Sequence, residues 1–100
     1  MKRESGFQAR ALKRLNSFDQ CKALALQPGY NGIETGTPDI IGSWTGHCFL
    51  IETKRDASNQ PTKIQEYRIL QWRYVGATVF VCNSNKDVEA FIMYMREHYG

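Results

Sequence analysis

Two strand-like runs separated by only two residues constrain this chain most. Residues 39–44 and 47–52 are rich in apolar and β-branched side chains, and Thr45-Gly46 is the only break between them. A two-residue turn with glycine second is an accepted hairpin connection, although Asn-Gly would be a stronger signal. With 45 and 46 in the turn, opposed residues have numbers that sum to 91. The sequence therefore predicts an antiparallel hairpin of fixed register.

This register sets Asp39 opposite Glu52, because 39 and 52 also sum to 91. Directly opposed side chains have Cβ atoms roughly 4.5–5.5 Å apart on one face of the sheet. Lys54 lies two residues beyond Glu52 and is expected to project from the same face. Two opposed carboxylates repel each other, and Mg²⁺ or Mn²⁺ held by oxygen ligands and water is the natural compensating cation. The pattern predicts the divalent-metal site of a nuclease.

A plainer interpretation is that Asp39 ends a turn after Pro38, while Glu52 and Lys54 are solvated residues of an edge strand. The run 49–51 argues against it, because Phe-Leu-Ile is apolar enough for a central strand. Unpaired charges are costly at the end of such a strand. The combined spacing therefore favours the metal site.

The whole chain, residues 1–100, is expected to form a single α/β domain. It has 42% hydrophobic residues, three prolines and no low-complexity tract. A core this small favours dimerisation, and a formal net charge of +3 suits a polyanionic partner without requiring one. Basic residues cluster near the start of the chain and around the hairpin. The candidates for contact with a nucleic-acid backbone are Arg10, Lys13, Arg14, Arg55 and Lys63.

The cysteines and the hydropathy pattern indicate the compartment. Cys21, Cys48 and Cys82 are odd in number and widely spaced, so they predict neither a disulfide framework nor a zinc cluster. Their apolar surroundings suggest buried thiols in a reducing compartment. There is no signal-peptide core and no apolar run approaching about eighteen residues. We expect a cytoplasmic protein that does not enter a membrane.

Helical periodicity predicts three helices. An amphipathic helix with a basic outer face is expected over residues 5–17, and a last helix is expected to start near residue 83. Between them, Thr62 and Gln65 form a capping-box sequence that starts a helix ending at Gly76. Ile64 and Leu70 are expected on the buried side of this middle helix.

Two further strands complete the order helix, strand, strand, strand, helix, strand, helix. The run 22–27 predicts a short strand before the hairpin, and the run 78–82 is apolar enough for a fully buried strand. A helical crossover would bring residues 78–82 beside the second hairpin strand. The expected architecture is a mixed sheet flanked by helices.

These elements and residues resemble the virus-type replication-repair nuclease domain (VRR-NUC), a branch of the PD-(D/E)XK superfamily that includes restriction endonucleases and Holliday-junction resolvases. The likeness runs from Glu4 to about Ser84. The matching positions are Glu4-x-x-Phe7-Gln8, Gly36-x-Pro38-Asp39, Glu52-x-Lys54 and Gln65. The resemblance implies a restriction-endonuclease-like core with the element order α-β-β-β-α-β-α.

The resemblance also implies roles for individual residues. Asp39 and Glu52 would be metal ligands, joined by Glu4 and by the backbone carbonyl of Thr53. Lys54 would orient or help activate the attacking water and stabilise the charge that develops on the phosphate.

Three polar residues at or near the implied site also have structural interpretations. Gln65 would lie near the catalytic groups, as a catalytic residue, and would also complete the capping box. Glu4 would be a favourable acid at a helix N-terminus even without a metal. Gln8 is either an exposed helix residue or a contact near the site. His47 and His98 have no evident partner for general-base catalysis.

The implied activity is that of an Mg²⁺- or Mn²⁺-dependent endodeoxyribonuclease that hydrolyses phosphodiester bonds by in-line attack of a metal-activated water. A domain of this length offers little surface for reading base sequence, so cutting of branched or junction DNA in replication, repair or recombination is favoured. The family resemblance implies a homodimer of phage or prophage origin, acting in the cytoplasm of a bacterial host, with no small-molecule cofactor.

Two alternatives stay open. The first is a non-catalytic nucleic-acid-binding module that has the same fold, although the presence of Asp39, Glu52 and Lys54 together argues against it. The second is an RNA-processing nuclease, although nothing in the sequence reads a 2′-hydroxyl.

Overall fold

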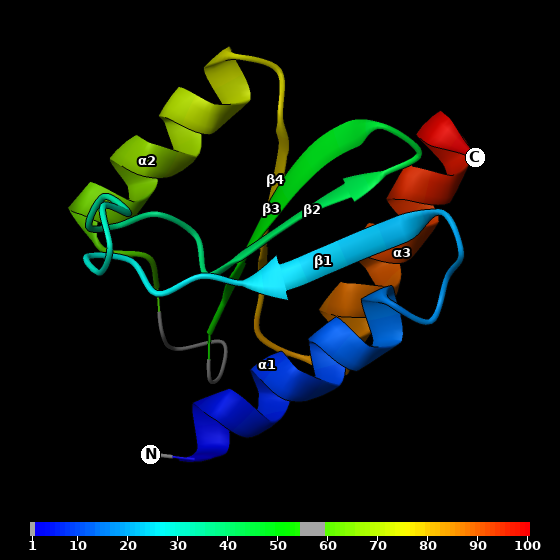
Figure 1. Ribbon diagram of the computed structural model, residues 1–100, viewed down its shortest axis with the longest axis horizontal. Helices are drawn as coiled ribbons and strands as arrows, with labels where there is room; N and C mark the ends of the chain where they lie inside the picture. Colours follow the sequence, from blue (N-terminus) through cyan, green and yellow to red (C-terminus); the bar gives the residue numbers. More distant parts are fainter. Residues whose placement is uncertain (1, 55–59) are drawn as a thin grey trace.

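The computed structural model describes residues 2–54 and 60–100, with side chains from Gly6 onward in the first helix. In the described chain, one four-stranded sheet carries helices on both faces (Figure 1). None of these helices has the length and apolarity that crossing a bilayer requires. The elements are α1 (Lys2–Leu15), β1 (Cys21–Ala25), β2 (Ile40–Trp44), β3 (His47–Thr53), α2 (Lys63–Tyr74), β4 (Thr78–Cys82) and α3 (Asn85–Tyr99).

The sheet is mixed and has the strand order β1-β2-β3-β4. β1 pairs with β2 and β2 with β3 in antiparallel fashion, whereas β3 and β4 are parallel. The predicted element order and the crossover from β3 to β4 are therefore confirmed. The predicted element boundaries are correct to within a few residues, since β1 starts one residue earlier than expected and α1 extends from Lys2.

The hairpin has the predicted register. Its ladder pairs Ile40 with Ile51 and Trp44 with His47, and both pairs sum to 91. Thr45 and Gly46 both have positive φ, at 46° and 89°. Two successive residues with positive φ characterise the type I′ turn, whose twist matches that of the flanking strands. The local sequence thus fixes the register of the hairpin.

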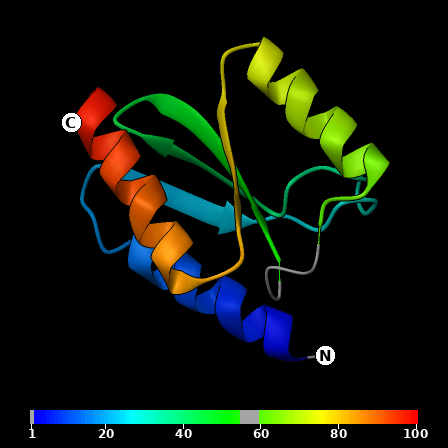
Figure 2. The same cartoon turned by 180° about the vertical axis from the view of Figure 1, so that it is seen from behind.

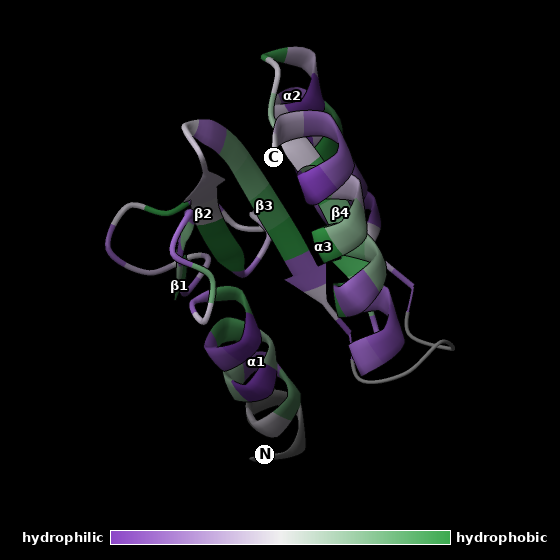
Figure 3. Ribbon diagram, turned by 90° about the vertical axis from the view of Figure 1, so that its right-hand side faces the viewer, coloured by the Kyte–Doolittle hydropathy of each residue, from purple (hydrophilic) through white to green (hydrophobic). Residues whose placement is uncertain are grey.

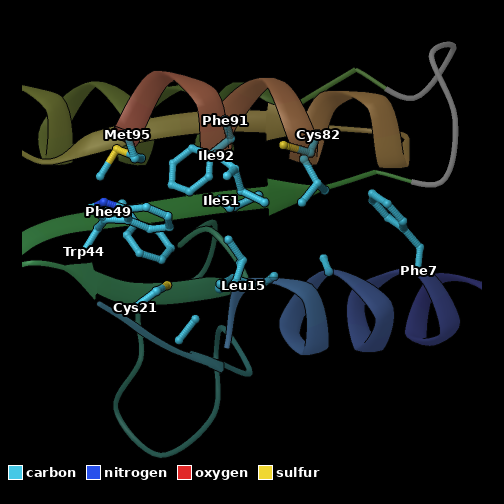
Figure 4. Close-up of a cluster of buried hydrophobic side chains, with 14 residues drawn as sticks. Phe7, Leu15, Cys21, Trp44, Phe49, Ile51, Cys82, Phe91, Ile92 and Met95 are labelled. Carbon is cyan, nitrogen blue, oxygen red and sulfur yellow. The ribbon is translucent and has the colours of Figure 1, made fainter. Parts of the chain in front are cut away.

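One face of the sheet is covered by α1 and α3, and the larger part of the core lies there (Figure 4). Side chains from both helices meet the inward-facing residues of all four strands. Phe49 and Phe91 pack with ring centroids 4.9 Å apart, and Trp44 lies 5.3 Å from Phe18. The cluster comprises Phe7, Ala11, Leu15, Cys21, Ala23, Ile40, Trp44, Phe49, Ile51, Cys82, Val88, Phe91, Ile92 and Met95.

The opposite face carries α2 and a much smaller cluster. Figure 2 shows α2 and α3 on opposite sides of β4. Leu50, Ile69 and Val79 form this second cluster, and Ile69 is the only buried residue of α2. The expectation that Ile64 and Leu70 face the core is wrong, because their side chains are 40% and 62% exposed. The helix rests on the sheet through Ile69 and the partly buried Trp72, and turns Ile64 and Leu70 outward.

β3 lies between β2 and β4 and contributes to both clusters. Phe49 and Ile51 point to the face of α1 and α3, and Leu50 points to the face of α2. Figure 3 shows that the strand is apolar along its middle and becomes polar at its C-terminal end. This polar end, at Glu52 and Thr53, is still buried. The sequence expectation of a central strand that ends in a buried charge is confirmed.

The three cysteines differ in burial. Cys21 and Cys82 are buried, but Cys48 is exposed, contrary to the expectation of three buried thiols. Cys48 lies near the hairpin turn, where α2 does not cover the sheet (Figure 1). Burial raises the pKa of the Cys21 thiol to about 11 and also raises the pKa of Cys48.

Substitution of Gly42 tests the close packing around the hairpin. An alanine Cβ at this position would lie 2.5 Å from the Lys22 carbonyl oxygen and 2.5 Å from Phe49 Cζ. We expect Gly42→Ala to lower the free energy of unfolding by about 1–3 kcal/mol or more, measured by urea denaturation. Gly6→Ala is the matched control, because it replaces a helical glycine with room for Cβ and should stabilise by about 0.5–1 kcal/mol. A Gly42→Ala protein as stable as wild type would contradict this packing.

Alkylation tests the burial of the thiols. The thiolate is the form that reacts, and a raised pKa lowers its fraction at pH 8. Exposed Cys48 should therefore react with iodoacetamide before Cys21 and Cys82, and all three should react in denaturant. Peptide mass mapping over time measures the order. Modification of Cys82 in the folded protein at the rate of Cys48 would contradict the structure.

Candidate active site

Asp39 lies just before β2, outside the regular ladder. The last pair of the hairpin is Ile40 with Ile51, so the predicted cross-strand pair of Asp39 and Glu52 is not part of the ladder. The backbone carbonyl of Asp39 accepts a hydrogen bond from Leu26 N at 2.8 Å. A hydrogen bond to the residue that follows β1 therefore helps to position Asp39, whereas Glu52 lies within β3.

The turn that precedes Asp39 packs against the first turn of α2. Gly36 has a φ of +89°, and a Cβ there would lie 2.9 Å from Ile64 Cγ1 and 3.0 Å from the Ile64 carbonyl oxygen. Arg68 Nε of α2 donates to the Thr35 carbonyl oxygen at 3.0 Å. A side chain at position 36 would be strained and would push the turn away from the helix. Glycine is required at this position for both reasons.

From the described part of the chain, the carboxylate of Asp39 accepts three hydrogen bonds. The Thr53 backbone N–H donates to Oδ1 at 2.8 Å. The Thr53 hydroxyl donates to Oδ2, and Gln8 Nε2 of α1 donates to the same oxygen at 2.9 Å. Gln8 is thus a contact within the site rather than an exposed helix residue. These donors hold the carboxylate from two different elements, α1 and β3.

Glu52 is a buried carboxylate at the end of β3, with 5% of its surface exposed. Gln65 Nε2 donates to Glu52 Oε2 at 3.2 Å, and Lys54 Nζ lies 3.5 Å from the same oxygen. Both partners approach from the face of the sheet that carries α2. Lys54 is close enough to compensate part of the carboxylate charge in these surroundings.

Gln65 connects the start of α2 with Lys54 and Glu52. Its Oε1 accepts from Thr62 N at 2.8 Å and from Lys54 Nζ at 2.9 Å. Thr62 Oγ1 in turn accepts from Gln65 N, which completes the predicted capping box. Because two donors meet Oε1, the amide is oriented with Nε2 toward Glu52. The capping role and the contact with the site therefore coexist in one side chain.

These side chains surround one open cavity of about 290 Å³. Its walls come from α1, β3, the start of α2 and the loop before β2. Most of the lining side chains are polar, which distinguishes this hollow from an apolar ligand pocket. The lining residues are Gln8, Pro28, Gly36, Thr37, Asp39, Glu52, Thr53, Lys54 and Gln65.

The donor set of the cavity suits a hard divalent cation. Among the side chains that the structure describes, no three His, Cys, Asp or Glu residues gather in one group. Asp39 and Glu52 nevertheless line the same cavity, and Mg²⁺ is commonly bound by one or two carboxylates plus several waters. The backbone of Thr53 also lies there, whereas the side chain of Glu4 lies outside the described residues.

The thiol of Cys82 lies behind the site and takes no part in this donor set. Cys82 pairs with Thr53 across the parallel ladder and is fully buried. Burial, together with the negative charges of Asp87 and Asp39, raises the pKa of Cys82 to about 12. A protonated, buried thiol is a poor nucleophile and a poor ligand. The chemistry of the cavity is therefore that of oxygen and nitrogen groups.

The predicted basic residues differ in their environments. Arg10 and Lys13 are exposed on the helix that carries Gln8, and Lys63 is exposed at the start of α2. Arg14 makes a bidentate ion pair with Glu89, at 2.7 and 3.0 Å. Its charge is thus partly neutralised within the chain, and the pair raises the pKa of Arg14 and lowers that of Glu89. Arg55 lies outside the described residues.

The histidines lie at the far end of the sheet from the cavity. His47 stacks on Tyr99 with ring centroids 3.8 Å apart, and His98 stacks on Tyr94 at 4.0 Å. Neither histidine lines the cavity. Both histidines therefore pack against tyrosines of α3, away from the candidate site.

Two contributions to the site were not foreseen in the sequence. Thr53 was predicted for its carbonyl oxygen, but its N–H and hydroxyl are the groups that hold Asp39. Arg68 fixes the loop before Gly36 to α2, a role that the sequence does not indicate. In the sequence, the hydroxyl-bearing residue between Glu52 and Lys54 is the signal that points to the role of Thr53. No feature of the sequence around Arg68 points to its contact with the loop.

Comparison with known proteins identifies the fold. No protein-family model matches the sequence, and no curated protein matches it. A solved structure described as "VRR_NUC domain" superimposes on this chain with a TM-score of 0.73 and 28% sequence identity, covering 98% of each chain. The resemblance that the sequence suggested is thereby confirmed, and the chain has the VRR_NUC domain fold of the nuclease family.

Proposed function

We propose that this protein is an Mg²⁺- or Mn²⁺-dependent endodeoxyribonuclease that cuts branched DNA. The observation that carries the proposal is the convergence of two carboxylates and a lysine, Asp39, Glu52 and Lys54, on one polar cavity. Carboxylates that hold a cation next to a fixed positive charge suit the hydrolysis of a phosphodiester. The VRR_NUC fold supports the same reaction class.

Asp39 and Glu52 would hold the cation, with the Thr53 carbonyl and Glu4 as further candidate ligands. Both carboxylates are already fixed by hydrogen bonds from the protein, so they lose little freedom on binding. When bound, Mg²⁺ or Mn²⁺ supplies Lewis-acid chemistry to the scissile phosphate and to water.

Lys54 is the candidate for stabilising the negative charge that develops on the phosphate. Its ammonium group is largely enclosed and directed by Gln65 Oε1 at 2.9 Å. A charge held in this way needs little reorganisation when the reaction proceeds. Lys54 is also the candidate for orienting the attacking water. Gln65 would hold the side chains of Lys54 and Glu52 in fixed positions relative to each other.

The polar lining of the cavity suits contact with the phosphate backbone of DNA. Among the residues that the structure describes, the nine that line the cavity include no aromatic side chain that would stack on a base, so contact with the sugar-phosphate backbone is favoured over reading of bases. Exposed Arg10 and Lys13 on α1 and Lys63 on α2 lie on elements that also line the cavity, where they would contact the backbone of DNA arms.

A homodimer would bring two such sites to one branched substrate. The outward face of α2 offers a surface for pairing, because Tyr67, Leu70 and Tyr74 are between 55% and 90% exposed. The same helix carries Glu66 in its first turn and Arg73 in its last. Two copies of α2 packed antiparallel across a twofold axis would bring these opposite charges together while covering the apolar side chains.

Cleavage assays test the catalytic assignment. Glu52→Gln and Asp39→Asn should abolish cutting of a labelled four-way junction, because each removes a charged cation ligand. Lys54→Met should slow cutting by roughly 10²–10³-fold. EDTA should stop the wild-type protein, and flap, linear duplex and RNA substrates run in parallel would rank its preferences.

Matched variants on the exposed side of α3 control for nonspecific effects. Glu97→Gln and Lys86→Met change the same residue types away from the cavity and should cut normally. DNA binding by the Glu52→Gln protein, measured by fluorescence anisotropy, separates lost chemistry from lost binding. Full cutting by Glu52→Gln would overturn the assignment, and tight binding without cutting by the wild type would favour a binding module.

Light scattering after size-exclusion chromatography tests the dimer. The wild-type protein should have the mass of two chains, and Leu70→Glu should shift it to one, because a buried charge would replace an apolar contact. Met93→Glu is the control, since Met93 is similarly exposed, at 61%, but lies on α3. A monomeric wild type, or a Leu70→Glu protein that stays dimeric, would contradict this interface.

A further inference from the structure

The three hydrogen bonds to Asp39 are unequally divided between its two oxygens. Oδ2 accepts from the Thr53 hydroxyl and from Gln8 Nε2, whereas Oδ1 accepts only from the Thr53 backbone N–H among the described residues. An ionised carboxylate cannot donate, so the hydroxyl and the amide must both be donors here. The direction of each hydrogen bond is therefore fixed by chemistry.

This division leaves one oxygen with acceptor capacity to spare. A carboxylate has about four lone-pair positions, two on each oxygen. The two donors on Oδ2 use both of its positions, and the single donor on Oδ1 uses one. With respect to the residues that the structure describes, Asp39 thus presents one open lone-pair position, on Oδ1.

The two donors on Oδ2 are firmly held. Thr53 lies in the buried end of β3, where its side chain is 3% exposed and its β-branched χ1 is restricted. Gln8 comes from α1, one helical turn from Ala11, which is buried in the main core. Because the donors come from separate elements, rotation of the carboxylate would break hydrogen bonds to both.

We infer that the Thr53 hydroxyl and the Gln8 amide restrict Asp39 to binding a cation through Oδ1 alone, and so select Mg²⁺ over Ca²⁺. Both act as positioning residues. The inference rests on the proposed function, since it assumes that Asp39 is a cation ligand.

The physical basis is the difference in how the two cations use carboxylates. Mg²⁺ is small, keeps near-octahedral geometry and retains several waters, so one oxygen from each carboxylate satisfies it. Ca²⁺ takes six to eight oxygen ligands and can bind a carboxylate through both oxygens to reach that number. A carboxylate whose Oδ2 already accepts two hydrogen bonds can still give Mg²⁺ the one oxygen that it needs. It cannot bind Ca²⁺ through both oxygens.

Nuclear magnetic resonance titration of ¹⁵N-labelled protein with MgCl₂ or CaCl₂ tests the inference without any substrate. The Thr53 amide donates to Oδ1, so its chemical shift reports cation binding at that oxygen. The variants are Thr53→Val, which removes the hydroxyl at similar shape, Thr53→Ser, which keeps it, and Gln8→Leu. A dispersed spectrum shows that each variant is folded.

We expect wild-type protein to bind Mg²⁺ more tightly than Ca²⁺. Thr53→Val and Gln8→Leu should each weaken Mg²⁺ binding roughly tenfold, with a much smaller loss for Ca²⁺, since partners of metal ligands typically contribute 10–100-fold to affinity. Thr53→Ser keeps the hydroxyl and should therefore have the wild-type ratio of Mg²⁺ affinity to Ca²⁺ affinity.

The possible failures are distinguishable. If Mg²⁺ binds the wild type but the ratio of affinities is unchanged in both Thr53→Val and Gln8→Leu, the inference is wrong while the proposed nuclease stands. If Thr53→Val does not fold, Gln8→Leu alone decides. If neither cation shifts the amides of Thr53 and Glu52 in the wild type, the inference and the metal site of the proposed function both fall.

Discussion

The buried carboxylate of Glu52 is the constraint on which the rest of the site depends. β3 runs through the middle of the sheet and ends in a charge that has lost most of its contact with water. A buried charge is costly unless it is paired and hydrogen-bonded. Lys54 and Gln65 meet this need, and they also bind each other, so the three side chains form a closed triangle. Since Gln65 belongs to α2, the start of that helix must stay at the end of β3.

The two faces of the sheet are stabilised by different interactions. Apolar packing holds α1 and α3, whose side chains interdigitate with residues from every strand. α2 buries Ile69 fully and Trp72 only in part. Its position therefore depends more on polar and steric contacts at its start and along one side: the capping box at Thr62, the fit of Gly36 against Ile64, and the hydrogen bond from Arg68 to Thr35. Most of these contacts lie at the cavity, so the helix and the site are fixed together.

Local rules predicted the parts of this structure that local interactions determine. The hairpin register follows from Thr45-Gly46, and the start of α2 follows from the capping box at Thr62. Periodicity failed for Ile64 and Leu70, because α2 is apolar on two sides and its sequence does not say which side is buried. The contact of Gln8 with Asp39 spans 31 residues, and no local pattern encodes it. The offset of Asp39 from the ladder likewise depends on the path of a loop, which the register of a hairpin does not specify.

The alternation of β3 explains why the site needs the order Glu52, Thr53, Lys54. Successive residues of a strand point to opposite faces, so Glu52 and Lys54 reach Gln65 on the side of α2, and Thr53 reaches Asp39 and Gln8 on the side of α1. The cavity therefore lies where the two layers meet, and each layer orients one of its carboxylates. Any residue other than proline between Glu52 and Lys54 could supply a backbone N–H to Asp39. A hydroxyl-bearing side chain at this position adds a second donor. It fixes the carboxylate of Asp39 to the strand that carries Glu52.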